Sequence, residues 1–191
     1  MIETWFPKTI FVENNILVDK LKFYENFIDS KLNSAGTHRH GIHYVESSHA
    51  SFDQFHTLPE MKDLVREIIS NVWEYLMALG YTESTISKLK LANMWVNRSK
   101  KGDYLYPHIH GESLLSGAYY VTCGDEDKIK FFNDMTESFL HPPDIANEYS
   151  NQYCEYSCTP GRLLLFKSNL IHGTESQKCD KKIVVSFNIR T

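Results

Sequence analysis

The 191-residue sequence predicts an α+β domain in which two helices pack on an antiparallel sandwich or barrel. Two observations predict this fold. Apolar residues recur at three- and four-residue steps in the first part of the chain, and the apolar period then changes to two. No Pro/Gly/Ser-rich linker divides the sequence. We therefore expect one domain over 1–191, with an N-terminal strand and helices over 1–85 and a strand core over 86–191.

The first part of the chain carries two amphipathic helical patterns. Apolar side chains recur at helical spacing from Leu17 to Leu32, which predicts a first helix that ends near Gly36. The second pattern starts at Pro59, a residue that suits the first position of a helix, and runs to Gly80. Each helix therefore has an apolar face to place against a sheet.

Strands are predicted from Ile86 onward, where the period changes to two. In the first of them, one face is expected to carry Leu89, Leu91, Asn93, Trp95 and Asn97. Further strands are expected at about 104–110, 116–123, 128–134, 153–158, 162–167, 170–176 and 181–190.

Two segments break these patterns. Residues 37–57 predict irregular structure with several histidines, which we expect to be exposed because no acidic or thiolate partners lie nearby. Residues 135–151 contain His141-Pro142-Pro143-Asp144 and little periodicity. A connection of this length in a compact domain is often functional, so this insertion is either an active-site lid or a surface loop.

Three histidines lie in or next to strand-like apolar tracts. Alternate side chains of an extended strand share a face, so His108 and His110 are expected to point the same way. His172 follows a second apolar tract over 163–171. Imidazole suits Fe(II), and three ligands on one side of an ion leave positions open for co-substrates. We therefore predict that His108, His110 and His172 bind a metal and that this metal carries the chemistry.

Four short motifs follow one another along nearly the whole chain: Trp5-Phe6-Pro7, His108-Ile109-His110, Ser116-Gly117-Ala118-Tyr119-Tyr120-Val121 and Ser186-Phe187-Asn188. This set resembles a subgroup of the 2-oxoglutarate/Fe(II)-dependent oxygenases. The resemblance implies a double-stranded β-helix, related to the jelly roll and the cupins, with two N-terminal helices on one sheet. It also implies an enzyme that uses Fe(II), 2-oxoglutarate and O₂ to hydroxylate an unidentified substrate, with release of succinate and CO₂.

The resemblance further implies residues that bind 2-oxoglutarate. The family places an Arg or Lys about where Lys182 lies, ten residues after His172. A cation there would bind the far carboxylate of 2-oxoglutarate, and Arg190 is the alternative. Further candidates for contacts with 2-oxoglutarate or substrate are Asn97, Ser186, Asn188 and Tyr119. Of the neighbouring pair Tyr119 and Tyr120, one is expected to face the site and the other the core.

One position departs from the family. Most of the superfamily has His-x-Asp or His-x-Glu where this chain has His108-Ile109-His110. Three neutral imidazoles would leave the iron with one more unit of positive charge than a set that includes a carboxylate. In an alternative register, His110 and Glu112 are the ligands and His108 lies outside the set. We favour His108 and His110, because Gly111 is expected to end the strand and spoil the alternation that would aim Glu112.

Two other functions stay open. A cupin-type three-His metal dioxygenase or isomerase would not use 2-oxoglutarate and would not need Lys182. A non-catalytic β-sandwich binding module would use the histidines to hold a structural metal.

The composition narrows the class of partner. A net charge of -4 and a pI near 6.1 give no general attraction to nucleic acid or anionic membranes. No signal peptide and no run of eighteen apolar residues stand in the sequence, so a cytoplasmic protein is expected. The aromatic N-terminal segment would suit either a core or a homodimer contact.

Overall fold

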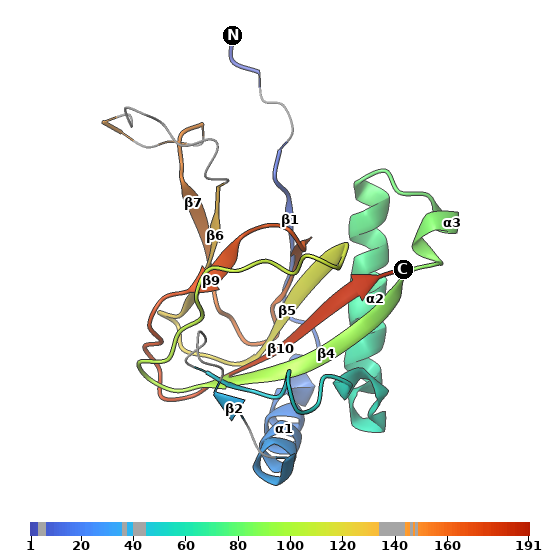
Figure 1. Ribbon diagram of the computed structural model, residues 1–191, viewed down its shortest axis with the longest axis vertical. Coiled ribbons are helices and arrows are strands. Elements are labelled where there is room, and N and C mark those ends of the chain that lie inside the picture. The colour runs from blue at the N-terminus through green and yellow to red at the C-terminus, as the bar shows by residue number, and fades with distance from the viewer. Residues whose placement is uncertain (4–6, 36–37, 40–44, 134–143, 146, 148) are drawn as a thin grey trace.

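The computed structural model describes residues 1–3, 7–35, 38–39, 45–133, 144–145, 147 and 149–191 (Figure 1). Its helices are α1 (Leu21–Ala35), α2 (Lys62–Ala78) and α3 (Glu83–Ile86), and short 3-10 turns occupy Val18–Lys20, Phe55–Thr57 and Pro59–Met61. Its strands are β1 (Ile10–Glu13), β2 (His38–Arg39), β3 (Glu46–Ser47), β4 (Lys90–Ser99), β5 (Leu115–Thr122), β6 (Lys128–Phe132), β7 (Tyr153–Ser157), β8 (Leu163–Lys167), β9 (His172–Thr174) and β10 (Lys182–Arg190).

The strands form two antiparallel sheets. The larger has seven strands in the order β1-β8-β5-β10-β4-β3-β2, and the smaller has three in the order β7-β6-β9. Side chains from both sheets form one apolar cluster, in which Tyr120 and Phe166 of the larger sheet join Ile129 and Phe131 of β6. The sheets therefore pack face to face, and the predicted α+β order of helices before strands is confirmed.

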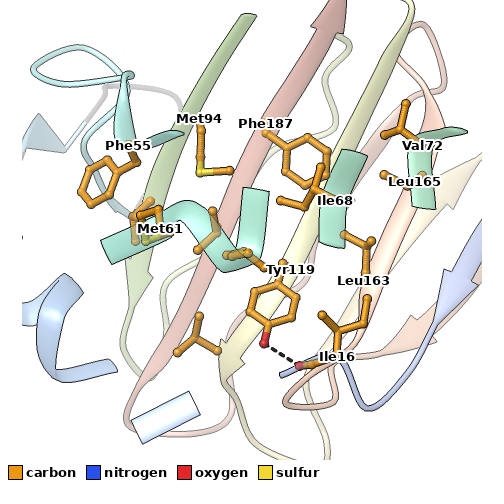
Figure 2. Close-up of a cluster of buried hydrophobic side chains, with 14 of the residues drawn as sticks. Ile16, Phe55, Met61, Ile68, Val72, Met94, Tyr119, Leu163, Leu165 and Phe187 are labelled. Carbon is orange, nitrogen blue, oxygen red and sulfur yellow. Dashed lines mark hydrogen bonds between the residues drawn. The ribbon is translucent and has the colours of Figure 1, made fainter. Parts of the chain in front are cut away.

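The helices cover the other face of the larger sheet. Ile28 of α1 and Ile68 of α2 belong to one buried cluster with Val185 and Phe187 of β10. Figure 2 shows part of this cluster, with Phe187 and Met94 reaching from the sheet toward Ile68. Because side chains alternate along β10, one strand supplies both the helix-side core and the space between the sheets.

Both predicted helices form, but each begins a few residues later than predicted, α1 at Leu21 and α2 at Lys62, after a short 3-10 turn. Tyr24, Ile28 and Leu32 are almost fully buried, as their spacing predicts. The helix does not begin at Leu17, because that residue has a left-handed backbone with φ 48° and only caps the short turn before α1. Within the described part of the chain, no helix is long and apolar enough to cross a membrane.

A bulge in β4 changes which face its residues occupy. Asn188 of β10 pairs with Asn93, but the next residue, Ile189, pairs with Leu91, so Ala92 is left without a partner. The expected common face of Leu89 and Leu91 with Trp95 is therefore wrong: both leucines pack on the helix-side core. An extra residue in one strand reverses the alternation beyond it.

Candidate functional site

Three histidines meet beside the space between the sheets. His172 begins β9, whereas His108 and His110 lie in the segment between β4 and β5. One ligand atom of each histidine lies within 4.8 Å of those of the other two. The ring centroids of His108 and His110 are 4.4 Å and 5.2 Å from that of His172. The three predicted ligands are thus brought together with the spacing that a single metal ion needs.

The predicted strand over 104–110 is wrong, and single backbone contacts hold its histidines instead. His108 and His172 form an isolated antiparallel bridge, in which each N–H donates to the other carbonyl at 2.9 and 3.0 Å. The N–H of His110 donates to the carbonyl oxygen of Ser168 at 2.8 Å. The convergence of His108 and His110 therefore comes from these two contacts and not from a shared strand face.

A glycine lets the histidine-bearing segment come close to β9. A Cβ atom on Gly173 would lie 2.8 Å from the carbonyl oxygen of Leu105 and 3.0 Å from the nitrogen of Pro107. Pro107 has no N–H to add to a ladder, so the segment makes isolated contacts with β9. One of them is the Thr174 N–H, which donates to the Leu105 carbonyl at 2.9 Å.

Backbone carbonyls fix the orientation of two imidazoles. Nδ1 of His108 lies 2.7 Å from the Tyr106 carbonyl oxygen, and Nδ1 of His172 lies 2.8 Å from the Leu170 carbonyl oxygen. Because a carbonyl only accepts, each Nδ1 carries the proton, and Nε2 is the ring nitrogen that can act as a metal ligand. Burial lowers the pKa of His108, which favours its neutral form.

Lys182 opens on the same cavity as the histidines. The cavity has a volume of about 380 Å³ and is lined by His108, His110, His172 and Lys182 among others. Lys182 is 5% exposed and makes no ion pair with a described acidic side chain, although the buried Asp127 lies close enough to interact with it electrostatically. A buried ammonium group that no described carboxylate contacts directly suits an anionic ligand.

The neighbouring cations lie elsewhere. Lys181 points to the other side of β10, where its ammonium group pairs with Glu25 at 2.7 Å and Asp29 at 2.5 Å of α1. Arg190 is exposed at the far end of the same strand. Of the two cations proposed for 2-oxoglutarate, Lys182 is therefore the one that faces the cavity.

Polar side chains form a row on the cavity wall. Asn97 and Ser186 both line the cavity, and Nδ2 of Asn97 donates to Oγ of Ser186 at 3.2 Å. Asn188 lies on the same face of β10, but its Oδ1 accepts from Oγ of Ser116 at 2.7 Å instead of facing the cavity. Asn97 and Ser186 are thus placed to contact a ligand in the cavity, whereas Asn188 lies behind the cavity wall and bonds to Ser116.

Tyr119 is not placed to bind a cofactor. Its ring is fully buried in the helix-side core and its hydroxyl donates to the Ile16 carbonyl at 2.8 Å (Figure 2). Tyr120, the next residue along β5, lines the cavity instead. The expectation that one of the two tyrosines faces the site holds for Tyr120, and the choice of Tyr119 is corrected.

Trp95 and His49 both lie on the cavity wall, and of these two only His49 was not assigned to the site from the sequence. His49 was expected to be an exposed loop histidine; it is exposed, but it also lines the cavity, and its ring centroid lies 4.6 Å from that of Trp95. The Trp95 centroid lies 5.7 Å from that of His110. No sequence signal distinguished His49, because its position depends on β3 pairing with β4. Trp95 could be found from its alternation with Asn97.

The alternative ligand Glu112 does not join the histidines. Its side chain is exposed, and the group of clustered metal-binding side chains found among the described residues is His108, His110 and His172. The Trp5-Phe6 part of the N-terminal motif, His40, His43 and most of the 135–151 insertion lie outside the described residues.

The family model for "Putative 2OG-Fe(II) oxygenase" matches residues 93–188, half of the chain. This match runs from Asn93 of β4 to Asn188 of β10 and contains all three clustered histidines. No curated protein sequence matches the chain significantly.

Solved structures of 2-oxoglutarate oxygenases share the fold. A Pseudomonas putida prolyl-4-hydroxylase is similar with a TM-score of 0.65 and 10% identity over 96% of this chain and 94% of that one. The viral collagen prolyl hydroxylase of Paramecium bursaria Chlorella virus-1, in complex with 2-oxoglutarate, gives 0.61 and 13% over 95% and 96%. HygX from Streptomyces hygroscopicus, with nickel and 2-oxoglutarate bound, gives 0.64 and 9% over 95% and 82%. The predicted jelly-roll fold is therefore confirmed.

The side chains of the cavity fit the two groups that the family uses. Three clustered imidazoles suit Fe(II), and a buried ammonium group suits a dicarboxylate. The chain belongs to the 2OG-Fe(II) oxygenase family, and it is an enzyme that depends on Fe(II) and 2-oxoglutarate.

Proposed function

We propose that the protein hydroxylates its substrate with O₂ while 2-oxoglutarate is converted to succinate and CO₂. In this proposal His108, His110 and His172 bind the iron, and Lys182 binds the far carboxylate of 2-oxoglutarate. One observation carries the proposal: a single cavity is lined by the three clustered imidazoles and by a buried ammonium group. That combination serves a dicarboxylate that must reach a metal and a cation at once.

The sheet register separates two ends of the cavity. Lys182 pairs with Ser99 of β4, whereas Trp95 pairs with Ser186, four residues further along each strand. At about 3.3 Å per residue, these pairs lie roughly 13 Å apart along the sheet. We assign the Lys182 end to 2-oxoglutarate and the Trp95 end, next to His49 and His110, to the substrate.

The chain's own residues then have distinct tasks. Bound Fe(II) supplies open coordination positions and the electrons for O₂ activation. Lys182 orients the co-substrate by a charge-assisted hydrogen bond, and Asn97 with Ser186 offers polar contacts between the two ends. Apolar neighbours such as Val184 and Phe166 keep water from the reacting groups.

The proposal is tested by adding Fe(II) and then 2-oxoglutarate to the protein without oxygen. A visible charge-transfer band of the chelate is expected in the wild type and not in His172→Ala. Admission of O₂ with a substrate should then release succinate in step with hydroxylated product. Intact iron binding without the band would instead support the cupin-type three-His enzyme, which the three-imidazole set also fits.

A further inference from the structure

A buried chain of polar side chains lies behind the histidines. Oγ of Ser168 is 2.8 Å from Oγ of Ser116, and Oγ of Ser116 is 2.7 Å from Oδ1 of Asn188. The three residues are 1%, 2% and 6% exposed. They come from the turn after β8, from β5 and from β10, so the chain joins the ligand-bearing side of the molecule to the centre of the larger sheet.

The direction of the hydrogen bonds follows from the donor count. The Ser116 hydroxyl has one proton, and it donates that proton to the Asn188 amide oxygen, which can only accept. Ser168 must therefore donate its own proton to Ser116. Each hydroxyl is held in one rotamer, and removal of any member leaves a buried neighbour without its partner.

The backbone around Ser168 holds two of the histidines. The carbonyl oxygen of Ser168 accepts from the His110 N–H at 2.8 Å, and the Ser168 N–H donates to the Leu114 carbonyl oxygen at 3.2 Å. Two residues further on, the Leu170 carbonyl oxygen lies 2.8 Å from Nδ1 of His172. The backbone from Ser168 to Leu170 thus makes hydrogen bonds to both His110 and His172.

We propose that Ser168, Ser116 and Asn188 are positioning residues that set the place of His110 relative to His172. The inference rests on the proposed role of these histidines as iron ligands. His110 lies outside any strand, so no ladder fixes it, and the backbone contact to Ser168 is the hydrogen bond described for its N–H. The hydroxyl chain anchors that contact to β5 and β10. It also gives the Ser-Gly and Ser-Phe-Asn motifs a shared task.

The test compares Ser168→Ala with Ser48→Ala. Ser48 is equally buried, at 1% exposure, and its Oγ accepts from the Val96 N–H at 3.1 Å, with no described contact to a ligand-bearing segment. Both variants should lose a similar part of their resistance to urea. Only Ser168→Ala should weaken Co(II) binding, by about 10- to 100-fold, as expected for a support behind a metal ligand. Its Co(II) visible spectrum should also change, because the ligand geometry changes.

A second variant keeps the inference testable if Ser168→Ala folds poorly. Asn188→Ala should weaken Co(II) binding as well, and the double variant should be little worse than Ser168→Ala alone, because both changes break one chain. Equal Co(II) affinity in Ser168→Ala, Asn188→Ala and the wild type would overturn the inference. A wild type that binds Co(II) but shows no 2-oxoglutarate band would refute the proposed function and leave the positioning role standing. A wild type that binds no Co(II) would refute both.

Discussion

His110 would give the proposed metal site a charge that sets it apart from the usual two-His, one-carboxylate set. The clustered ligands are three imidazoles, and the described cavity wall contains no Asp or Glu. A divalent ion held by three neutral imidazoles would keep both of its positive charges, and the buried Lys182 lines the same cavity. With the proposed ligands, the site would favour a dianion such as 2-oxoglutarate more strongly than a carboxylate-containing site would.

Substitution of His110 and Glu112 tests the ligand set. His110→Ala should weaken Fe(II) binding by more than about 100-fold, since even changes behind a ligand cost 10- to 100-fold. His110→Asp should keep substantial affinity, because a carboxylate is an ordinary iron ligand. Glu112→Ala should bind as the wild type does, because this side chain is exposed and outside the cluster. Anaerobic Fe(II) titrations measure all three. Loss of iron binding in Glu112→Ala, with retention in His108→Ala, would show that His110 and Glu112 are the ligands and that His108 is not.

Lys182 and Arg190 form a matched pair on one strand. Lys182→Ala should raise the Kd for 2-oxoglutarate by about 10- to 100-fold, which corresponds to the loss of a charged hydrogen bond. Arg190→Ala should leave that Kd unchanged, because Arg190 is exposed at the far end of β10. Both Kd values are measured from the intensity of the anaerobic chelate band at increasing 2-oxoglutarate concentration. A higher Kd in Arg190→Ala than in Lys182→Ala would show that Arg190, and not Lys182, binds the far carboxylate.

The side chains of the candidate site were largely predictable, and the exceptions have physical reasons. His108, His110, His172 and Lys182 follow from residue type, spacing and resemblance. The choice between Tyr119 and Tyr120 could not be made from the sequence, because the irregular loop before β5 breaks the alternation of side chains on which such a choice depends.

Strands β5 and β10 interlock at one glycine. A Cβ atom on Gly117 would lie 2.1 Å from Cζ of Phe187, so the ring of Phe187 occupies the space where any other residue would place its side chain. This contact couples the Ser-Gly motif to the Ser-Phe-Asn motif in this fold. It also ties the wall of the cavity to the helix-side core.

Gly117→Ala should therefore destabilise the protein by about 1–3 kcal/mol, the usual penalty for overpacking a core. Urea unfolding measures this change in the free energy of unfolding. In a Phe187→Leu background the same substitution should cost less, because the smaller side chain leaves room for the methyl group. An unchanged midpoint for Gly117→Ala in the wild-type background would contradict the interlock.

The elements show where a sequence pattern stops being sufficient. The helices and the strands after β4 were predicted nearly in place, because their apolar periods run unbroken. The bulge at Ala92 and the bridged segment 104–110 were not, since both depend on a partner strand distant in sequence. The pairing of β1 with β8, which joins Ile10 to Phe166, is equally non-local.

The molecule as a whole places its helices and its reactive cavity on opposite faces of one sheet. The ion pairs of Lys181 with α1, and of Arg98 with Glu46 at 2.7 Å and Asp29 at 3.1 Å, tie the helix layer to β10, β4 and β3. The cavity is closed on its other side by β6 and β9 of the smaller sheet. A metal that joins His172 to His108 and His110 therefore adds a link between the smaller sheet and the β4–β5 connection.

Metal should consequently stabilise the whole fold. At a free concentration of 100 times the Kd, Co(II) should raise the free energy of unfolding by about 2.7 kcal/mol. 2-Oxoglutarate should add a further increase only when the metal is present, because its binding at Lys182 is completed by the metal. Urea unfolding with and without each ligand measures these increments. His172→Ala should show neither, and an equal rise in that variant would point to binding elsewhere.

The alternation of side chains along β10 determines what kind of defect a mutation in this strand causes. Ile183, Val185 and Phe187 face the helices, whereas Lys182 and Ser186 face the cavity. A library of every substitution in this strand, sorted once for cellular abundance and once for turnover, should give two interleaved phenotypes. Changes at odd-numbered positions should deplete the protein itself, and changes at Lys182 or Ser186 should leave an abundant but inactive one. Neighbouring codons would thus be under different kinds of selection, with a period of two.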